Sequence, residues 1–140
     1  MNTDLLSSID NVYQQISISD FKTIEQCLSN FENDVKVVSQ SFEIDELEAL
    51  FLIAIVINNT EYKTCQLEDI ADKLEISRFE ILKNLDILFS LQSKSLIEIN
   101  DYEETMMETK RFLTRNRYPI EIMNKSIKIS KTVENNLLNI

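Results

Sequence analysis

Apolar residues recur every three or four positions over the first part of the chain, which is the spacing of one face of an α-helix. The first such stripe contains Leu5, Leu6, Ile9, Val12 and Ile16. The second contains Phe21, Ile24, Leu28, Phe31, Val35 and Val38. The pattern predicts two amino-terminal helices that pack on a common core. An alternative for the second helix is a partly exposed stripe, through which residues 20–39 would form a homodimer.

A third helix is predicted to start at Asp45 and to be buried on every side. Asp45 can accept bonds from the free amides of the first turn, and Glu48 can reach back to the amide of Asp45. The run ALFLIAIVI at residues 49–57 is apolar around the whole helix, so this helix should lie at the centre of the domain. We expect it to end at residues 58–60 and a short strand to follow at residues 62–65.

The segment LEDIADKLEISRFEILKNLDILFSLQSKSLIEI, residues 67–99, predicts two helices joined by a sharp turn. In the first of them Leu67, Ile70, Ala71 and Leu74 share one face. Ser77 can cap the second, with Glu80 returning the bond to the Ser77 amide. We expect this second helix to continue unbroken beyond Phe89. Two helices with this capped turn between them are typical of a helix-turn-helix.

Two short apolar stretches follow the helix-turn-helix. Residues 96–99 read as a strand and residues 126–130 as its return strand, with a short helix at the carboxyl end. The predicted fold is mainly α: a winged helix-turn-helix at residues 42–140 with a small β wing, preceded by two extra helices at residues 1–41. The last helix ends in Val133, Leu137, Leu138 and Ile140. These residues have little chain after them to pack against, as expected of a fragment of a longer protein.

The two faces of the helix after Ser77 decide what a helix-turn-helix of this sequence would contact. At 3.6 residues per turn, Ile81, Leu85 and Leu88 point to the core. The opposite face presents Phe79, Lys83, Asp86 and Ser90. Base edges are usually bonded by Arg, Lys, Asn or Gln, and this face offers one lysine offset by one acid. With Leu82 and Phe89 on its flank, Phe79 forms a candidate protein contact.

The charge balance also favours protein contact over DNA contact, except in one basic segment. The chain holds 24 acidic and 14 basic residues, a net charge of −10, whereas DNA-binding modules usually need a basic face. The segment KRFLTRNRY at residues 110–118 is basic, however. A DNA-binding alternative would place Arg78 and Lys83 in the groove and Lys110, Arg111, Arg115 and Arg117 on phosphates. The other interpretation of this segment is a solvated loop.

Composition argues against several kinds of site. The chain has no glycine and no histidine, so it lacks a phosphate-binding loop, a dinucleotide motif and a histidine-based catalytic triad. Cys27 and Cys65 have no companions at metal-ligand spacing and are expected to be reduced. We therefore expect no cofactor, no metal and no catalysis. The longest apolar run is too short to span a bilayer, and no secretory signal is indicated, so a cytoplasmic location without membrane contact is expected.

Residues 42–99 resemble winged-helix domains. More narrowly, they resemble the amino-terminal winged-helix region of AAA-type ATPases from bacteria, many of them Bacteroidetes. The similarity rests on FEIDELEALFLIAIVI, on the Ile-Ser-x-x-Glu-Ile-Leu-Lys start of the third helix of the motif, and on the length of that helix. Residues 126–139 match loosely. Ser95 stands where winged helices usually have the glycine that permits a left-handed turn, which makes that turn more costly here.

The resemblance implies a module attached to an ATPase whose phosphate loop would lie beyond Ile140. We therefore expect a non-catalytic, regulatory or protein-binding winged-helix domain, with a protein or the attached ATPase as its partner. The alternative is a transcription-factor-like domain that binds duplex DNA.

Overall fold

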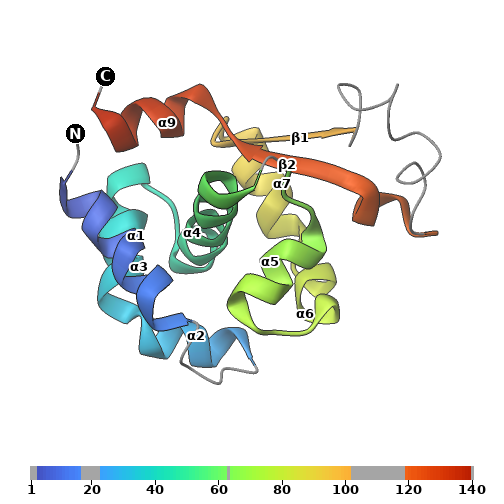
Figure 1. Cartoon of the computed structure of the whole chain (residues 1–140), viewed down its shortest axis with the longest axis horizontal. Coiled ribbons are helices and arrows are strands. Elements are labelled where there is room, and N and C mark those ends of the chain that lie inside the picture. Colours follow the sequence, from blue (N-terminus) through green and yellow to red (C-terminus); the bar gives the residue numbers. More distant parts are fainter. Residues whose placement is uncertain (1–2, 17–22, 63, 102–118, 140) are drawn as a thin grey trace.

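Helix α4 (Glu46–Glu61) runs through the middle of the molecule, with other elements around it (Figure 1). The structure is a computed structural model that describes residues 3–16, 23–62, 64–101 and 119–139. Residues 48–58 of α4 are all buried, as the all-round apolar run predicts. The predicted cap is confirmed: the Glu48 amide donates to Asp45 at 2.8 Å, and the Asp45 amide donates to Glu48 at 3.1 Å. The helix ends at Glu61, slightly later than predicted.

The amino-terminal helices cover one side of α4. They are α1 (Thr3–Ile16), α2 (Ile24–Asn30) and α3 (Glu32–Phe42). A single helix over the second stripe was the wrong prediction, because the backbone leaves helical geometry at Phe31, with φ −113° and ψ 27°. The Phe31 side chain is buried at this corner. The corner lets two short helices, rather than one long one, follow the surface of α4.

The apolar stripe of α2 and α3 lies inside the chain's own core. Its buried members are Ile24, Phe31, Val35 and Val38; Leu28 is half-buried against the core, and Phe21 lies outside the described residues. Homodimerisation through residues 20–39 stays a prediction, now without the exposed stripe that suggested it. The core is also continuous across residues 41 and 42, and the division into an extension and a domain at that point likewise stays a prediction.

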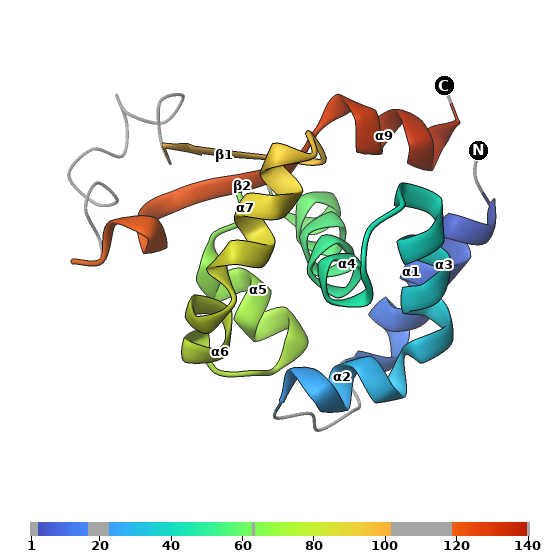
Figure 2. The same ribbon diagram turned by 180° about the vertical axis from the view of Figure 1, so that it is seen from behind.

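Helices α5 (Leu67–Leu74), α6 (Arg78–Lys83) and α7 (Leu85–Ser93) lie on the other side of α4, as Figure 2 shows. Leu67, Ile70, Ala71 and Leu74 of α5 are all buried, as predicted. The Ser77 hydroxyl caps α6 by accepting from the Glu80 amide at 3.2 Å. The expected return bond from Glu80 is not formed between these two described residues, so only half of the predicted capping box is present.

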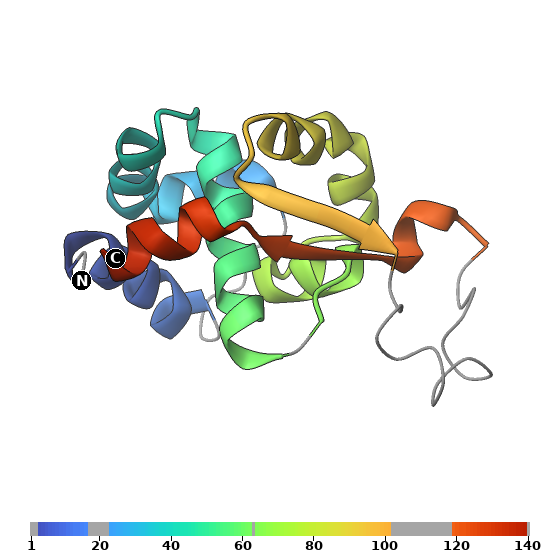
Figure 3. The same cartoon turned by 90° about the horizontal axis from the view of Figure 1, so that it is seen from above.

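Strands β1 (Ile97–Asp101) and β2 (Lys125–Ile129) form a two-stranded antiparallel sheet across the end of the molecule (Figure 3). Both lie within two residues of their predicted positions, and Ile99 is paired with Ile127. A short 3-10 helix, η1 (Glu121–Asn124), precedes β2. The predicted strand at residues 62–65 is not assigned among the described residues. Only the Cys65 carbonyl bonds to β2 there, by accepting from the Ile127 amide at 2.7 Å.

Helix α9 (Lys131–Leu138) runs back from β2 toward α1 (Figure 3). Ser130 caps it by accepting from the Val133 amide. Val133 and Leu137 are buried, so the expectation that they have little to pack against was wrong. They reach the domain's own core because the chain turns back over it. Leu138 is 40% exposed, and Ile140 lies outside the described residues.

Among the described helices, α3, α5 and α9 end at a residue in the left-handed region, and α7 is followed by such a residue just after its C-cap, although the chain has no glycine. These residues are Glu43, Glu75, Ser95 and Asn139, with φ between 56° and 62°. Ser95 therefore does adopt the left-handed turn for which it is poorly suited. The described residues form a mainly helical fold with one small antiparallel sheet.

Candidate functional site

The helix that follows Ser77 is divided in two, which the sequence did not predict. At Asn84 the backbone has φ −117° and ψ 29°, so α6 ends and α7 begins there. The Asn84 side chain donates to the Glu80 carbonyl at 2.8 Å, and its amide donates to the Ile81 carbonyl at 2.9 Å. Asn84 thus satisfies carbonyl groups at the end of α6, as a capping side chain does. The face predicted for one straight helix is spread over two helices.

The predicted core side of this segment is confirmed, since Ile81 and Leu88 are buried and the half-buried Leu85 packs against the core. On the outer side Phe79 is 72% exposed and Phe89 is 48% exposed, the former on α6 and the latter on α7. Leu82 is half-buried. Helices α6 and α7 therefore each present a large aromatic ring to solvent, and exposed aromatic rings are a feature of protein-contact surfaces.

The polar residues on the same two helices differ in their exposure and in their bonding partners. Lys83 and Asp86 are exposed, as predicted. Ser90 was expected on the exposed face, and this was wrong: it is half-buried and its hydroxyl donates to Glu48 Oε2 at 2.6 Å. Arg78 is not free either, because its guanidinium lies 3.1 Å from Glu68 Oε2.

Most of the other cations among the described residues are, like Arg78, paired with a carboxylate. All of them except Lys83 lie within 4 Å of a carboxylate. The paired residues are Lys36, Lys73, Arg78, Lys94, Lys125, Lys128 and Lys131. Most of these pairs are exposed and contribute little stability. They do, however, place a carboxylate beside nearly every cation that a phosphate would have to bind.

A buried carboxylate fixes α7 against the start of α4. Glu48 is 2% exposed, and Lys94, just after α7, donates to both of its oxygens at 2.8 and 2.9 Å. Burial disfavours the charged form of Glu48, but the bonds from Lys94, Ser90 and the Asp45 amide outweigh it, so its pKa lies below the usual value. The sequence indicated the cap at Asp45, but gave no local sign that Ser90 and Lys94 would complete this network.

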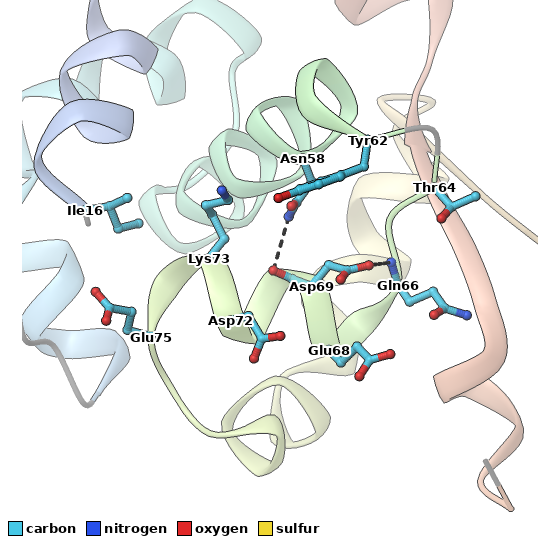
Figure 4. A pocket seen from close by; sticks show the side chains of 10 residues that line it. All are labelled: Ile16, Asn58, Tyr62, Thr64, Gln66, Glu68, Asp69, Asp72, Lys73 and Glu75. Atoms are coloured by element: carbon cyan, nitrogen blue, oxygen red, sulfur yellow. Dashed lines mark hydrogen bonds between the residues drawn. The ribbon is translucent and has the colours of Figure 1, made fainter. Parts of the chain in front are cut away.

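An acidic cleft of about 560 Å³ lies between the ends of α1, α4 and α5 (Figure 4). Its acidic lining comes from Glu68, Asp69, Asp72 and Glu75, and of the described residues that line it, Lys73 is the cation. Beside it, Lys73 donates to Glu61 at 2.6 Å and Tyr13 donates to the same carboxylate at 3.1 Å. These bonds join three helices. The bond from Lys73 is the main reason that the pKa of Glu61 lies below its usual value.

Neither cysteine is set up as a nucleophile. Burial raises the pKa of Cys27 to about 11 and that of Cys65 to about 12. The two thiols are free, in keeping with the prediction that they are reduced. Among the described residues, no group of three or more Asp, Glu or Cys is placed to hold a metal ion.

The basic candidate contacts Lys110, Arg111, Arg115 and Arg117 lie outside the described residues. Of the nucleic-acid candidates, the structure therefore places only Arg78 and Lys83, and Arg78 is paired with Glu68. The three protein-contact candidates Phe79, Leu82 and Phe89 are all described and lie on the α6 and α7 pair.

Across the described residues, no helix combines the length and the apolar character needed to cross a membrane. Comparisons of this chain with protein families, with curated proteins and with solved structures found no match.

Proposed function

We propose that this chain is a winged-helix module that binds protein, and that it has no catalytic role of its own. The support for the fold is the order of the elements. Three helical segments, α4, α5 and the α6 and α7 pair, are followed by two antiparallel strands, the order that the resemblance of residues 42–99 implies. The expected motif accounts for this order with two changes: its third helix is divided at Asn84, and among the described residues no strand is assigned at residues 62–65.

The observation that carries the proposed function is the exposure of Phe79 and Phe89 on the helix pair that would face a ligand. Exposing an aromatic ring to water costs free energy, and this free energy is regained when a partner covers the ring. Aromatic residues are also enriched among those that dominate protein interfaces. We infer a partner with an apolar recess for these rings and basic residues around it, because the chain carries a net charge of −10.

The same face is poorly suited to DNA. A protein that binds DNA uses its cations to displace the counterions held by the phosphates, and this release of counterions dominates non-specific affinity. On α6 and α7 the exposed side of the helices offers Lys83 with Asp86 close to it in sequence, while Arg78 is held by Glu68. A DNA ligand would have to compete with that carboxylate for Arg78.

In this proposal the module places an attached AAA-type ATPase on its protein partner or substrate. The support is the similarity of residues 42–99 to the winged-helix region of such ATPases. Sequencing the coding region past Ile140 tests this part, since a GxxxxGK[ST] motif there would support it and a different domain would refute it.

Binding to duplex DNA distinguishes the proposed function from its alternative. In fluorescence anisotropy titrations at low salt, we expect the whole chain to bind labelled duplexes weakly and without sequence preference. The variants Lys83→Glu and Arg115→Glu should then differ little from the wild type. Tight, sequence-dependent binding that falls steeply with salt and is lost in both variants would establish the DNA-binding alternative.

A further inference from the structure

The two edges of the small sheet differ in whether other parts of the fold hydrogen-bond to them. On the outer edge of β2, the Ile127 amide donates to the Cys65 carbonyl at 2.7 Å. The side chain of Asn59, from α4, accepts from the Ile129 amide at 2.8 Å and donates to the Ile127 carbonyl at 3.4 Å. A loop carbonyl and one amide side chain therefore occupy the place of a third strand, and this edge is closed.

The hydrogen-bond pattern of the sheet shows which groups of β1 point away from β2. The Ser130 amide donates to the Leu96 carbonyl at 3.0 Å, so Leu96 and Ser130 face each other as a bonded pair. Bonded and non-bonded pairs alternate along an antiparallel ladder. The register then makes Glu98 with Lys128 and Asn100 with Ser126 bonded pairs. The amides and carbonyls of Ile97, Ile99 and Asp101 point to the outer edge of β1.

No described residue bonds to these outward groups of β1. Ile97 is 2% exposed, so its part of the edge is covered. Ile99 is half-buried and Asp101 is exposed, so the edge is open from Ile99 onward. A groove of about 360 Å³ lies beside the strand, lined by β1 residues 97–100, by Gln92 of α7, by Ser95 in the turn after α7, and by Ser130 after β2. An open strand edge beside a groove can accept another strand.

We propose that the open edge of β1 binds an extended, basic peptide segment of a partner protein, which adds to the sheet as a third strand. Charge selects this occupant. The side chains of Glu98 and Asp101 are 47% and 72% exposed. Strand β2 shows which pattern β1 accepts, since its Lys128 lies 3.7 Å from Glu98 and its Lys125 pairs with Asp101. Glu98 and Asp101 lie on opposite faces of the sheet, because successive side chains of a strand alternate. A strand of alternating lysine and apolar residues on the other edge would therefore bring its lysines to the face of Glu98 and its apolar residues to the face of Ile97 and Ile99.

Charge also disfavours a second copy of the chain at this edge. Antiparallel pairing of two β1 strands about Ile99 would place Glu98 of each copy opposite Asn100 of the other, with both Glu98 carboxylates on the same face of one short ladder. Each copy also has a net charge of −10. Like charges across a strand pair are destabilising, and charged residues on a short edge strand are a common protection against self-association.

The test is an NMR titration of the isotope-labelled whole chain with a short, blocked peptide of alternating lysine and isoleucine. We expect saturable shifts centred on Ile99 and Asp101, and amide exchange at Ile99 slowed about tenfold or more at saturation. A peptide with glutamate in place of lysine should bind at least about tenfold more weakly. Methylation of alternate peptide amides should abolish binding, because it removes the donors that pair with β1.

A pair of variants separates backbone pairing from side-chain contact. Ile99→Pro removes an outward amide without removing the bonds to β2, whereas Ile99→Val keeps that amide. Binding should be lost only in the first variant, and the methylated peptide tests the same bond if that variant does not fold. Three results would overturn the proposal: no saturation up to about 1 mM, equal binding of the methylated peptide, or shifts centred on α6 and α7. Self-association of the free chain through Ile99, detected by sedimentation, would instead make a second copy the occupant.

This inference is independent of the proposed function, because it uses a different surface. Loss of peptide binding at β1 would leave the Phe79 and Phe89 face untouched. Conversely, a DNA-binding result for α6 and α7 would leave the open edge of β1 in place.

Discussion

Individual residues in this chain compensate for the absence of glycine. Helix ends that glycine usually forms are made by Glu43, Glu75, Ser95 and Asn139 in the left-handed conformation. For a residue with a Cβ atom this conformation costs about 1–2 kcal/mol. The cost is local and should be removable one residue at a time, without changing the fold.

Replacing Ser95 with glycine should stabilise the protein. Ser95 has φ 62°, and glycine adopts this conformation without the steric cost, so we expect Ser95→Gly to raise the free energy of unfolding by about 0.5–1 kcal/mol. Urea denaturation measures the change. The control is Ser93→Gly, two residues earlier at the last residue of α7, where glycine should destabilise the helix end and also removes the bond from the Ser93 hydroxyl to the Ser90 carbonyl. Destabilisation by both substitutions would show that the Ser95 turn is not strained.

A second residue-scale prediction concerns the buried carboxylate of Glu48. Its pKa in the folded protein lies below the value of about 4.3 expected in the unfolded chain. The charged network therefore stabilises the fold fully above that unfolded value, and the stabilisation is lost as the pH falls toward the folded pKa. Glu48→Gln should lower the free energy of unfolding by about 1–3 kcal/mol at pH 7.

The pH dependence provides the specific signature of the Glu48 network. The difference between wild type and Glu48→Gln should shrink as the pH is lowered below about 4, since protonated Glu48 no longer holds Lys94 as an ion pair. Unfolding by urea at a series of pH values measures it. Glu46→Gln, at the exposed start of the same helix, is the control and should show little effect. A constant difference at all pH values would contradict the assignment.

Elements are fixed in this fold by caps and amphipathic faces, and by a few bonds between segments far apart in sequence. The caps at Asp45 and Ser77 and the buried faces of α1 and α5 could be predicted, because the spacing that produces them lies within one helix. The strands could be located because short apolar runs follow polar turns.

The breaks at Phe31 and Asn84 could not be predicted in this way. Neither position has the proline or glycine that usually interrupts a helix, so the interruption depends on how each half packs: α2, α3 and α7 against α4, and α6 against α5. The partners of Ser90 and Asn59 were also missed. Ser90 lies 42 positions from Glu48, and Asn59 lies 70 positions from Ile129, so no local spacing indicates these bonds.

At the element scale, Asn59 should be the main link between α4 and the sheet edge. Asn59→Ala removes both bonds to β2 and leaves the Ile129 amide without its partner, which should cost about 1–3 kcal/mol of unfolding free energy. Thr60→Ala is the matched control, since Thr60 bonds within its own helix, to the Ile57 carbonyl. Hydrogen exchange should show the Ile129 amide opening faster only in Asn59→Ala. Equal effects of the two substitutions would remove this role from Asn59.

The whole molecule is acidic, and its described cations are almost all paired with carboxylates. The described part thus leaves one exposed and unpaired cation, Lys83, and two exposed rings on α6 and α7, where the proposed helix-turn-helix would meet its ligand. A basic protein surface complements this arrangement, while a phosphate backbone does not. The class of ligand bound at Phe79 is therefore the central claim.

Photocrosslinking from position 79 tests that claim most directly. The whole chain, with a benzophenone amino acid in place of Phe79, is irradiated in the cells that produce it, and the adducts are treated with nuclease or with protease. If Phe79 contacts a protein partner, the adducts should have defined masses and resist nuclease. They should be absent when the probe replaces Tyr13, an exposed aromatic residue on α1. Adducts that nuclease removes, or the same adducts from both positions, would contradict the claim.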